Sequence, residues 1–194
     1  MGKNRLEAFS DGVLAIIITI MVLEIKMPHS PDWAALQDLL PVFISYLLSF
    51  VFVGIYWGNH HHLLHIVNRV SGGIIWANLN LLFWLSLIPF ATGWMGENHF
   101  AQNTVIVYAG LLMACGVAYT ILQKVIKSGH KTDDRLAATY ASQERKGLIS
   151  LVLYAASIGF AFYNTTISGL MFLIVSILWI IPDKNIERLV EGEH

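Results

Sequence analysis

The sequence predicts an all-α integral membrane protein with six transmembrane helices, and two observations point to that class. Hydrophobic residues make up 56% of the 194 residues and charged residues only 13%, whereas a soluble domain carries about 25% charged residues. The apolar residues also form continuous runs close to the roughly 20 residues that cross a bilayer. They do not alternate with polar residues as they would in the strands of a membrane barrel.

The composition excludes several other classes of protein. So little charge cannot cover the surface of a soluble enzyme, and a disordered chain would need low hydrophobicity. The net charge of −1 gives no reason to expect nucleic acid as a partner, because its binding requires clustered lysine and arginine. Cys115 is the only cysteine, so a disulfide framework and a multi-cysteine metal site are ruled out.

Six apolar runs follow one another along the chain. They cover about 5–26, 33–65, 71–95, 100–127, 135–162 and 166–181. The first ends at Glu24 and Lys26, and the second is longer than a bilayer requires, so its end is expected to extend into water. No linker rich in glycine and serine separates the runs, which predicts a single six-helix domain over 1–194.

The last two spans have their own signals. The fifth begins as an amphipathic segment near Arg135 and becomes wholly apolar from Leu148. The sixth is expected to end at Pro182, because proline cannot continue a helix. The charged segment 143–146, before the apolar part of the fifth span, is interpreted as a solvated turn at the membrane surface.

Lysine and arginine are distributed unevenly between the two sides of these spans. If the N-terminus is cytoplasmic, Lys26 is the only one of the 12 lysines and arginines that falls outside. A bias of this size is typical of the positive-inside rule. We therefore expect both termini to face the cytoplasm.

The first span carries polar residues that are costly in hydrocarbon. Asp11 lies one to two turns inside its cytoplasmic end, and at 100° per residue it is about 140° around the helix from Ile16. An inward-facing carboxylate needs hydrogen-bond donors, which could come from Arg5, from the histidines that end the second span, or from Asn78 or Asn80 in the third. Asp11 is either a functional site or a buried charge that holds three helices together.

One stripe of the same helix is apolar apart from a threonine. Residues at i, i+3, i+4 and i+7 share this face: Ile16, Thr19, Ile20 and Leu23. Periodicity alone is equally typical of a lipid-facing surface or of core packing.

The end of the second span carries four histidines: His60, His61, His62 and His65. His61 and His65 are spaced i, i+4, which can present two imidazoles to a metal ion. A membrane metalloenzyme would need further clusters on other helices, so we favour histidines that cap the helix at the membrane surface. One of them could partner Asp11 and make that site sensitive to pH.

The chain has no motif for catalysis. It contains no Gly-x-Ser-x-Gly elbow, no phosphate-binding loop with its lysine, and no Thr-Val-Gly-Tyr-Gly filter of the common potassium channels. Cys115 lies in an apolar stretch, where a thiol behaves as a small hydrophobic group. We expect no enzyme activity, no catalytic residues, and no bound metal or other cofactor.

The opening of the first span resembles the signature of the transmembrane protein 175 family, the lysosomal potassium channels and their bacterial relatives. The matching residues are Arg5-x-x-x-Phe9-Ser10-Asp11, followed by an Ile-rich run that contains Thr19. Trp57-x-x-His60 resembles the motif of the second helix, and Asn78-Leu79 and Pro89 resemble that of the third. The last three spans resemble the family only in length and hydropathy.

The resemblance implies a modestly selective potassium channel of the single-repeat prokaryotic type in the bacterial inner membrane. Four chains would assemble as a homotetramer in the bilayer, and the first helix of each would line a pore for monovalent cations. Ile16, Ile20 and Leu23 would then form hydrophobic constrictions, and Thr19 would contribute to potassium selectivity. The family motif would form an interhelical network: Arg5, Phe9, Ser10 and Asp11 packed against Trp57, His60 and Asn78.

A proton-coupled secondary transporter is the alternative function. Asp11 and His60 would serve it as a proton relay. Transporters place their substrate sites at helix breaks near the membrane midplane, and Pro89 is the break that the sequence offers.

Overall fold

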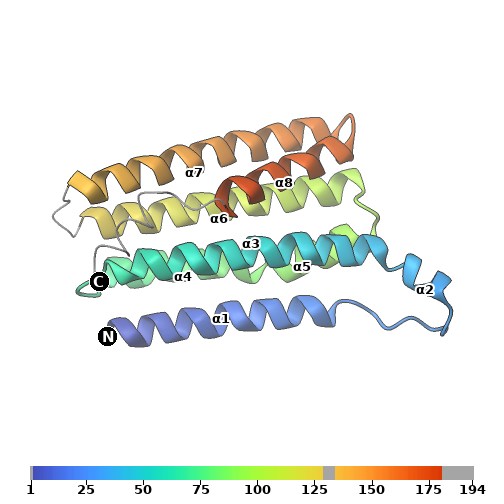
Figure 1. Cartoon of the computed structure of the whole chain (residues 1–194), viewed down its shortest axis with the longest axis horizontal. Helices are drawn as coiled ribbons and strands as arrows, with labels where there is room; N and C mark the ends of the chain where they lie inside the picture. The colour runs from blue at the N-terminus through green and yellow to red at the C-terminus, as the bar shows by residue number, and fades with distance from the viewer. Residues whose placement is uncertain (1, 129–133, 181–194) are drawn as a thin grey trace.

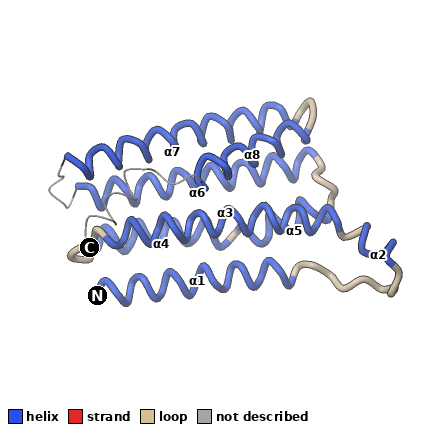
Figure 2. The backbone as a smooth tube through the Cα atoms, viewed as in Figure 1, coloured by secondary structure: helices blue, strands red, loops and turns tan. Residues whose placement is uncertain are grey.

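The computed structural model describes residues 2–128 and 134–180, and every regular element in these residues is a helix (Figures 1 and 2). The helices are α1 (Lys3–Leu23), α2 (Trp33–Gln37), α3 (Leu40–His65), α4 (Gly72–Ser86), α5 (Ile88–Glu97), α6 (Gln102–Ser128), α7 (Asp134–Ala161) and α8 (Thr165–Ile180). The predicted all-α class is therefore confirmed.

Four segments are long and apolar enough to cross a membrane: α1, α3, the combined stretch Gly72–Glu97 and α6. Helix α8 is apolar but has only 16 residues. Six spans stay a prediction, because α7 and α8 do not meet the same measure of length and hydropathy.

The long helices lie side by side in one bundle, with α1 at one face and α7 at the opposite face (Figure 1). Helix α1 packs against α3, α4 and α5, whereas α7 packs against α6 and α8. Helix α6 lies between these two groups of helices, because it contacts α4 and α5 on one side and α7 on the other. This arrangement leaves one side of α1 at the surface of the chain.

Two predicted spans are each divided in the structure. The run 33–65 consists of α2 and α3, and Pro41 lies in the first turn of α3, where a missing N–H costs nothing. The run 71–95 breaks between α4 and α5 at Leu87, two residues before Pro89. Since proline removes one backbone hydrogen bond and restricts the residue before it, both breaks come just before a helix that has a proline in its first turn.

The interpretation of residues 143–146 as a solvated turn is wrong. They lie within α7, and Gln143 is buried, where it accepts a hydrogen bond from Gln123 of α6. The amphipathic start of α7 thus buries one of its polar side chains against a polar partner. Pro182, Lys131, Lys184 and Arg188, which entered the predictions above, lie outside the described residues.

A polar cluster crosses the middle of the bundle. The Thr92 hydroxyl donates to Ser49 Oγ at 2.7 Å, and Ser49 Oγ is 2.8 Å from the Tyr108 hydroxyl. These buried side chains belong to α5, α3 and α6. Because buried hydroxyls are costly unless they are paired, the cluster fixes how these three helices meet.

Basic residues gather at one end of the bundle. The start of α1, the α3–α4 turn, the end of α6 and the start of α7 all lie at the left end in Figure 1. Lys3, Arg5, Arg69 and Lys127 belong to these segments, whereas Lys26 follows the opposite end of α1. The assignment of the basic end to the cytoplasm stays a prediction from the distribution of charge.

Candidate functional site

Helix α1 has one buried side. Its buried residues recur every three or four positions: Leu6, Ser10, Leu14, Ile17 and Met21. This side packs against α3, α4 and α5. The spacing matches one face of an α-helix, so the rotation of α1 about its own axis is set by the burial of these residues.

The opposite side of α1 carries the four residues that the sequence placed in one stripe, Ile16, Thr19, Ile20 and Leu23, here called the α1 stripe. Ile16 is 58%, Ile20 42% and Leu23 79% exposed. Thr19 is also exposed, and its hydroxyl donates a hydrogen bond of 2.9 Å to the carbonyl oxygen of Ile16. Ile16 and Ile20 line an open groove of about 540 Å³ beside α5.

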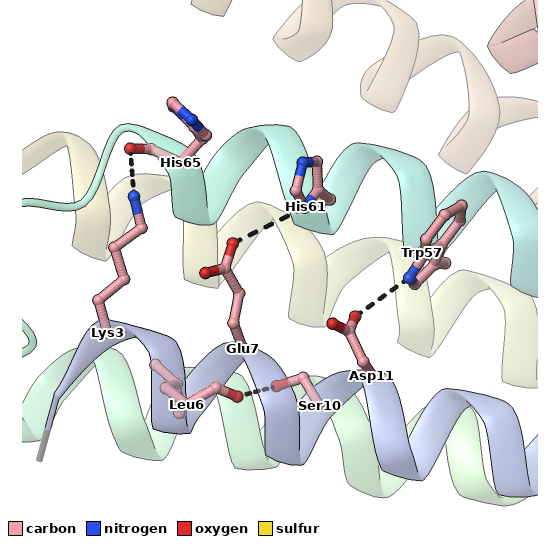
Figure 3. A network of polar contacts seen from close by, with 8 residues as sticks. All are labelled: Lys3, Leu6, Glu7, Ser10, Asp11, Trp57, His61 and His65. Atoms are coloured by element: carbon pink, nitrogen blue, oxygen red, sulfur yellow. Dashed lines mark hydrogen bonds and ion pairs between the residues drawn. The ribbon is translucent and has the colours of Figure 1, made fainter.

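Three polar contacts join the first half of α1 to the last part of α3, and we call them the α1–α3 ladder (Figure 3). Lys3 Nζ donates to the carbonyl oxygen of His65 at 2.7 Å. Glu7 lies 3.7 Å from His61 Nδ1, an ion pair when His61 is protonated, and Asp11 Oδ1 accepts a 3.0 Å hydrogen bond from Trp57 Nε1. Each contact lies four residues further along α1 and four residues back along α3, because the two helices are antiparallel.

A second, buried chain of hydrogen bonds joins α3, α4 and α1. Asn78 Nδ2 donates to Ser10 Oγ at 2.9 Å, and the Ser10 hydroxyl donates to the carbonyl oxygen of Leu6 at 2.9 Å. Asn78 Oδ1 accepts from His60 Nε2 at 2.7 Å. Since an amide oxygen can only accept, these directions place the hydrogen of the neutral His60 ring on Nε2.

The partner of Asp11 is Trp57, and none of the donors inferred from the residues alone fills that role. His60 is paired with Asn78, and its Nδ1 atom is buried with no hydrogen-bond partner among the described residues. Arg5 and Phe9 are exposed, and neither takes part in the ladder or in the buried chain. Asp11 and His60 therefore do not form a direct proton relay in this structure.

Sequence reasoning missed two members of the ladder, Lys3 and Glu7. The available signal was their spacing from Asp11. Residues 3, 7 and 11 follow one another at intervals of four, as residues 57, 61 and 65 do on α3, and residues four apart lie on one side of a helix.

The histidines beside the ladder contact one another without forming a metal cluster. The ring of His61 is 5.7 Å from that of His62 and 6.3 Å from that of His65, measured between centroids. Over residues 2–128 and 141–180, no group of three His, Cys, Asp or Glu side chains could hold a metal ion.

The other end of α1 is followed by an ion pair between Lys26 and Glu97 at the end of α5. The hydrogen bond and negative charge of Glu97 raise the pKa of Lys26 above its usual value. Both side chains are exposed, so the pair is expected to contribute little to stability. Glu97, the acidic member of this pair, lines the groove next to the α1 stripe together with Glu24.

Replacing Asp11 is expected to lower the yield of folded, assembled protein without changing the ion selectivity of the protein. Asp11→Ala leaves the Trp57 N–H without its carboxylate partner, and a hydrogen bond to a charged group contributes about 1.5–3 kcal/mol. The measurement is the amount of assembled protein recovered by size-exclusion chromatography, together with ion preference after reconstitution. Normal yield with an altered ion preference would contradict this assignment.

Comparison with known proteins gives consistent results. Residues 5–89 match the family model described as endosomal/lysosomal potassium channel TMEM175. The chain is 50% identical over 188 residues to a protein named as a potassium channel from Chryseobacterium sp. (strain P1-3), covering 97% of each chain. It is also 42% identical over 79 residues to the Danio rerio endosomal/lysosomal proton channel TMEM175, covering 34% of this chain and 15% of that one.

A solved structure has the same fold. It is the crystal structure of a lysosomal potassium-selective channel TMEM175 homologue from Chamaesiphon minutus. It matches with a TM-score of 0.79 and 26% identity, covering 92% of this chain and 96% of that one. The four long apolar helices and the similarity to these channels identify the chain as a multi-pass membrane protein. The chain belongs to the TMEM175 family.

Proposed function

We propose that this chain is one subunit of a homotetrameric potassium channel in which four copies of α1 surround the pore. The observation that carries the proposal is the two-sided character of α1. Polar contacts and buried side chains anchor one side to α3 and α4, while the residues of the α1 stripe are exposed, with Ile16 and Ile20 at the edge of an open groove. The names of the bacterial relatives supply the class of ion.

The stripe has the chemistry of a hydrophobic gate. Four copies of Ile16 meeting on one axis would exclude water, and a dehydrated ion cannot pass without replacement ligands, so such a constriction closes by dewetting. Ile20 and Leu23, one and two turns further along, would form additional apolar layers. Thr19 would supply the polar contact to permeant potassium between them, which is consistent with modest selectivity in the absence of a carbonyl filter.

The complete subunit in this proposal has six spans, with α7 and α8 as the fifth and sixth. Both termini face the cytoplasm, and the channel lies in the bacterial inner membrane. The basic residues at the end of the bundle that holds the start of α1 support this orientation, because positive charge is retained on the cytoplasmic side.

Ion flux through purified protein in liposomes tests the activity. We expect a potassium gradient to drive sustained current that does not saturate at low ion concentration. A proton-coupled transporter would instead show saturable uptake that requires a pH gradient. A proton current without potassium current would match the name of the animal relative and contradict the proposal.

Cysteine cross-linking tests whether α1 lies on the shared axis. Leu23→Cys is expected to form disulfide-linked dimers of subunits under mild oxidation, because four copies of this exposed residue would surround the pore. The native Cys115 is buried and should not compete. Tyr163→Cys is the control, since Tyr163 is 89% exposed in the α7–α8 turn, far from the proposed axis. Cross-linking at Tyr163 but not at Leu23 would place another surface at the centre.

A further inference from the structure

A small cavity lies inside the bundle, away from the α1 stripe. It has a volume of about 30 Å³ and is lined by residues of α3, α6, α7 and α8. Helix α1 contributes no residue to it. The lining includes hydroxyl and amide side chains from α3, α6 and α7.

Some of these polar groups are paired across the helices. Gln123 of α6 donates to Gln143 of α7. The Tyr119 hydroxyl donates to the carbonyl oxygen of Asn59 at 3.2 Å, and Trp179 Nε1 of α8 donates to Ser150 Oγ at 2.9 Å. These bonds join α3, α6, α7 and α8 around the cavity.

Other polar atoms at the cavity have no protein partner. Neither the Tyr56 hydroxyl nor the Tyr154 hydroxyl is hydrogen-bonded to a described residue, although both residues line the cavity. The bond between Gln123 and Gln143 also leaves one polar atom of each amide unpaired. Tyr154 is only 3% exposed, so its side chain has little contact with the surroundings of the chain.

We propose that this cavity is a binding site for about two water molecules, since each water needs about 10–15 Å³ and two to four polar partners. A buried hydroxyl or amide without a partner in an apolar medium costs several kcal/mol, and water is the ligand small enough to reach these groups. The same volume excludes a larger polar ligand. The site belongs to the part of the bundle away from the pore, so it does not depend on the proposed function.

Two glycines keep the space open. A Cβ atom added at Gly147 would have Thr120 Oγ1, at 4.0 Å, as its nearest neighbour, and one added at Gly116 would lie 3.9 Å from the Tyr56 hydroxyl and 3.5 Å from Leu151. Alanine therefore fits at either position without a clash. Its methyl group would occupy part of the volume that we assign to water.

Hydroxyl-radical labelling of the intact protein in isotope-labelled water tests the site, because radicals generated from bound water oxidise the side chains beside it. We expect Tyr154 to be labelled several-fold more than Tyr108. Tyr108 is the internal control, because it is fully buried and its hydroxyl is paired with Ser49. Equal, low labelling of Tyr154 and Tyr108 would overturn the proposal.

Variants connect the labelling to this cavity. Gly147→Ala is expected to reduce the labelling of Tyr154 several-fold, with Gly116→Ala as a second variant. Gly159→Ala is the matched control, since Gly159 lies on the same helix and has open space around it. Labelling that is insensitive to both cavity-filling variants would place the water elsewhere and overturn the assignment.

Thermal unfolding gives an independent readout. In a dry cavity, Tyr154→Phe would remove an unpaired buried hydroxyl and raise the unfolding temperature. In a hydrated cavity, the same change removes a satisfied hydroxyl, and we expect the unfolding temperature to stay the same or to fall. A clear rise would contradict the presence of water.

Discussion

Ile16→Asn is expected to raise the current through the reconstituted channel at least about tenfold, the equivalent of lowering the barrier by about 1.4 kcal/mol. Ile16 is 58% exposed and lines the open groove between α1 and α5. An asparagine at this position brings an amide that can hydrate the constriction and replace water around a passing cation. Ile16→Ala should also raise the current, because it widens the same point without adding a polar group. The measurement is single-channel recording in planar bilayers.

Val22→Asn is the control for this prediction. Val22 is also exposed on α1, but it lies about 120° around the helix from Ile16. The same polar substitution there should leave the current close to that of the unmodified channel. Unchanged conductance in both Ile16 variants would remove Ile16 as the constriction, and an increase in Val22→Asn alone would mean that a different side of α1 lines the pore.

Asn78→Ala is expected to destabilise the folded protein by about 1–3 kcal/mol, because it leaves the buried N–H of His60 without an acceptor, whereas the Ser10 hydroxyl still donates to Leu6. Asn78 accepts from His60 and donates to Ser10, and all three side chains are buried. The measurement is reversible unfolding in mixed micelles, followed by the yield of assembled protein.

Asn80→Ala provides the matched comparison. Asn80 is the same residue type on the same helix, two positions further on, and it is only partly buried. No hydrogen bond joins its side chain to another described residue, so its loss should cost less than that of Asn78. Equal destabilisation in the two variants would show that the buried hydrogen bonds from His60 to Leu6 add nothing to the stability of the fold.

The fold could be predicted well from the sequence where hydropathy alone decides the structure. Continuous apolar runs gave an all-α membrane protein and the approximate positions of the long helices. The break at Leu87 could not be predicted with the same certainty from hydropathy. Pro89 lies within an apolar run, and proline is tolerated inside membrane helices. The segment 143–146 was misread for a related reason. Charged residues beside Gln143 suggested a surface turn, whereas the helix continues and buries this one side chain.

The faces of α1 could be predicted because helical geometry fixes which residues lie together. The stripe of Ile16, Thr19, Ile20 and Leu23 follows from spacing, and the structure leaves all four exposed. The partner of Asp11 did not follow from spacing, since several donors were within reach and only packing selects Trp57. Trp57 entered the predicted network through the family resemblance alone. The closure of a pore by four chains is not determined by one chain, so its residues stay predictions.

The position of the ladder along α1 has a mechanical consequence. In the described residues, every hydrogen bond and ion pair from α1 to α3 or α4 lies between Lys3 and Asp11, whereas the stripe begins at Ile16. The second half of α1 is held instead by apolar packing against α5, through buried side chains such as Ile17 and Met21. Because apolar packing is not directional, this half can shift more easily than the hydrogen-bonded half, so a spin label at Leu23 should move further than one at Ile16 when the channel changes state.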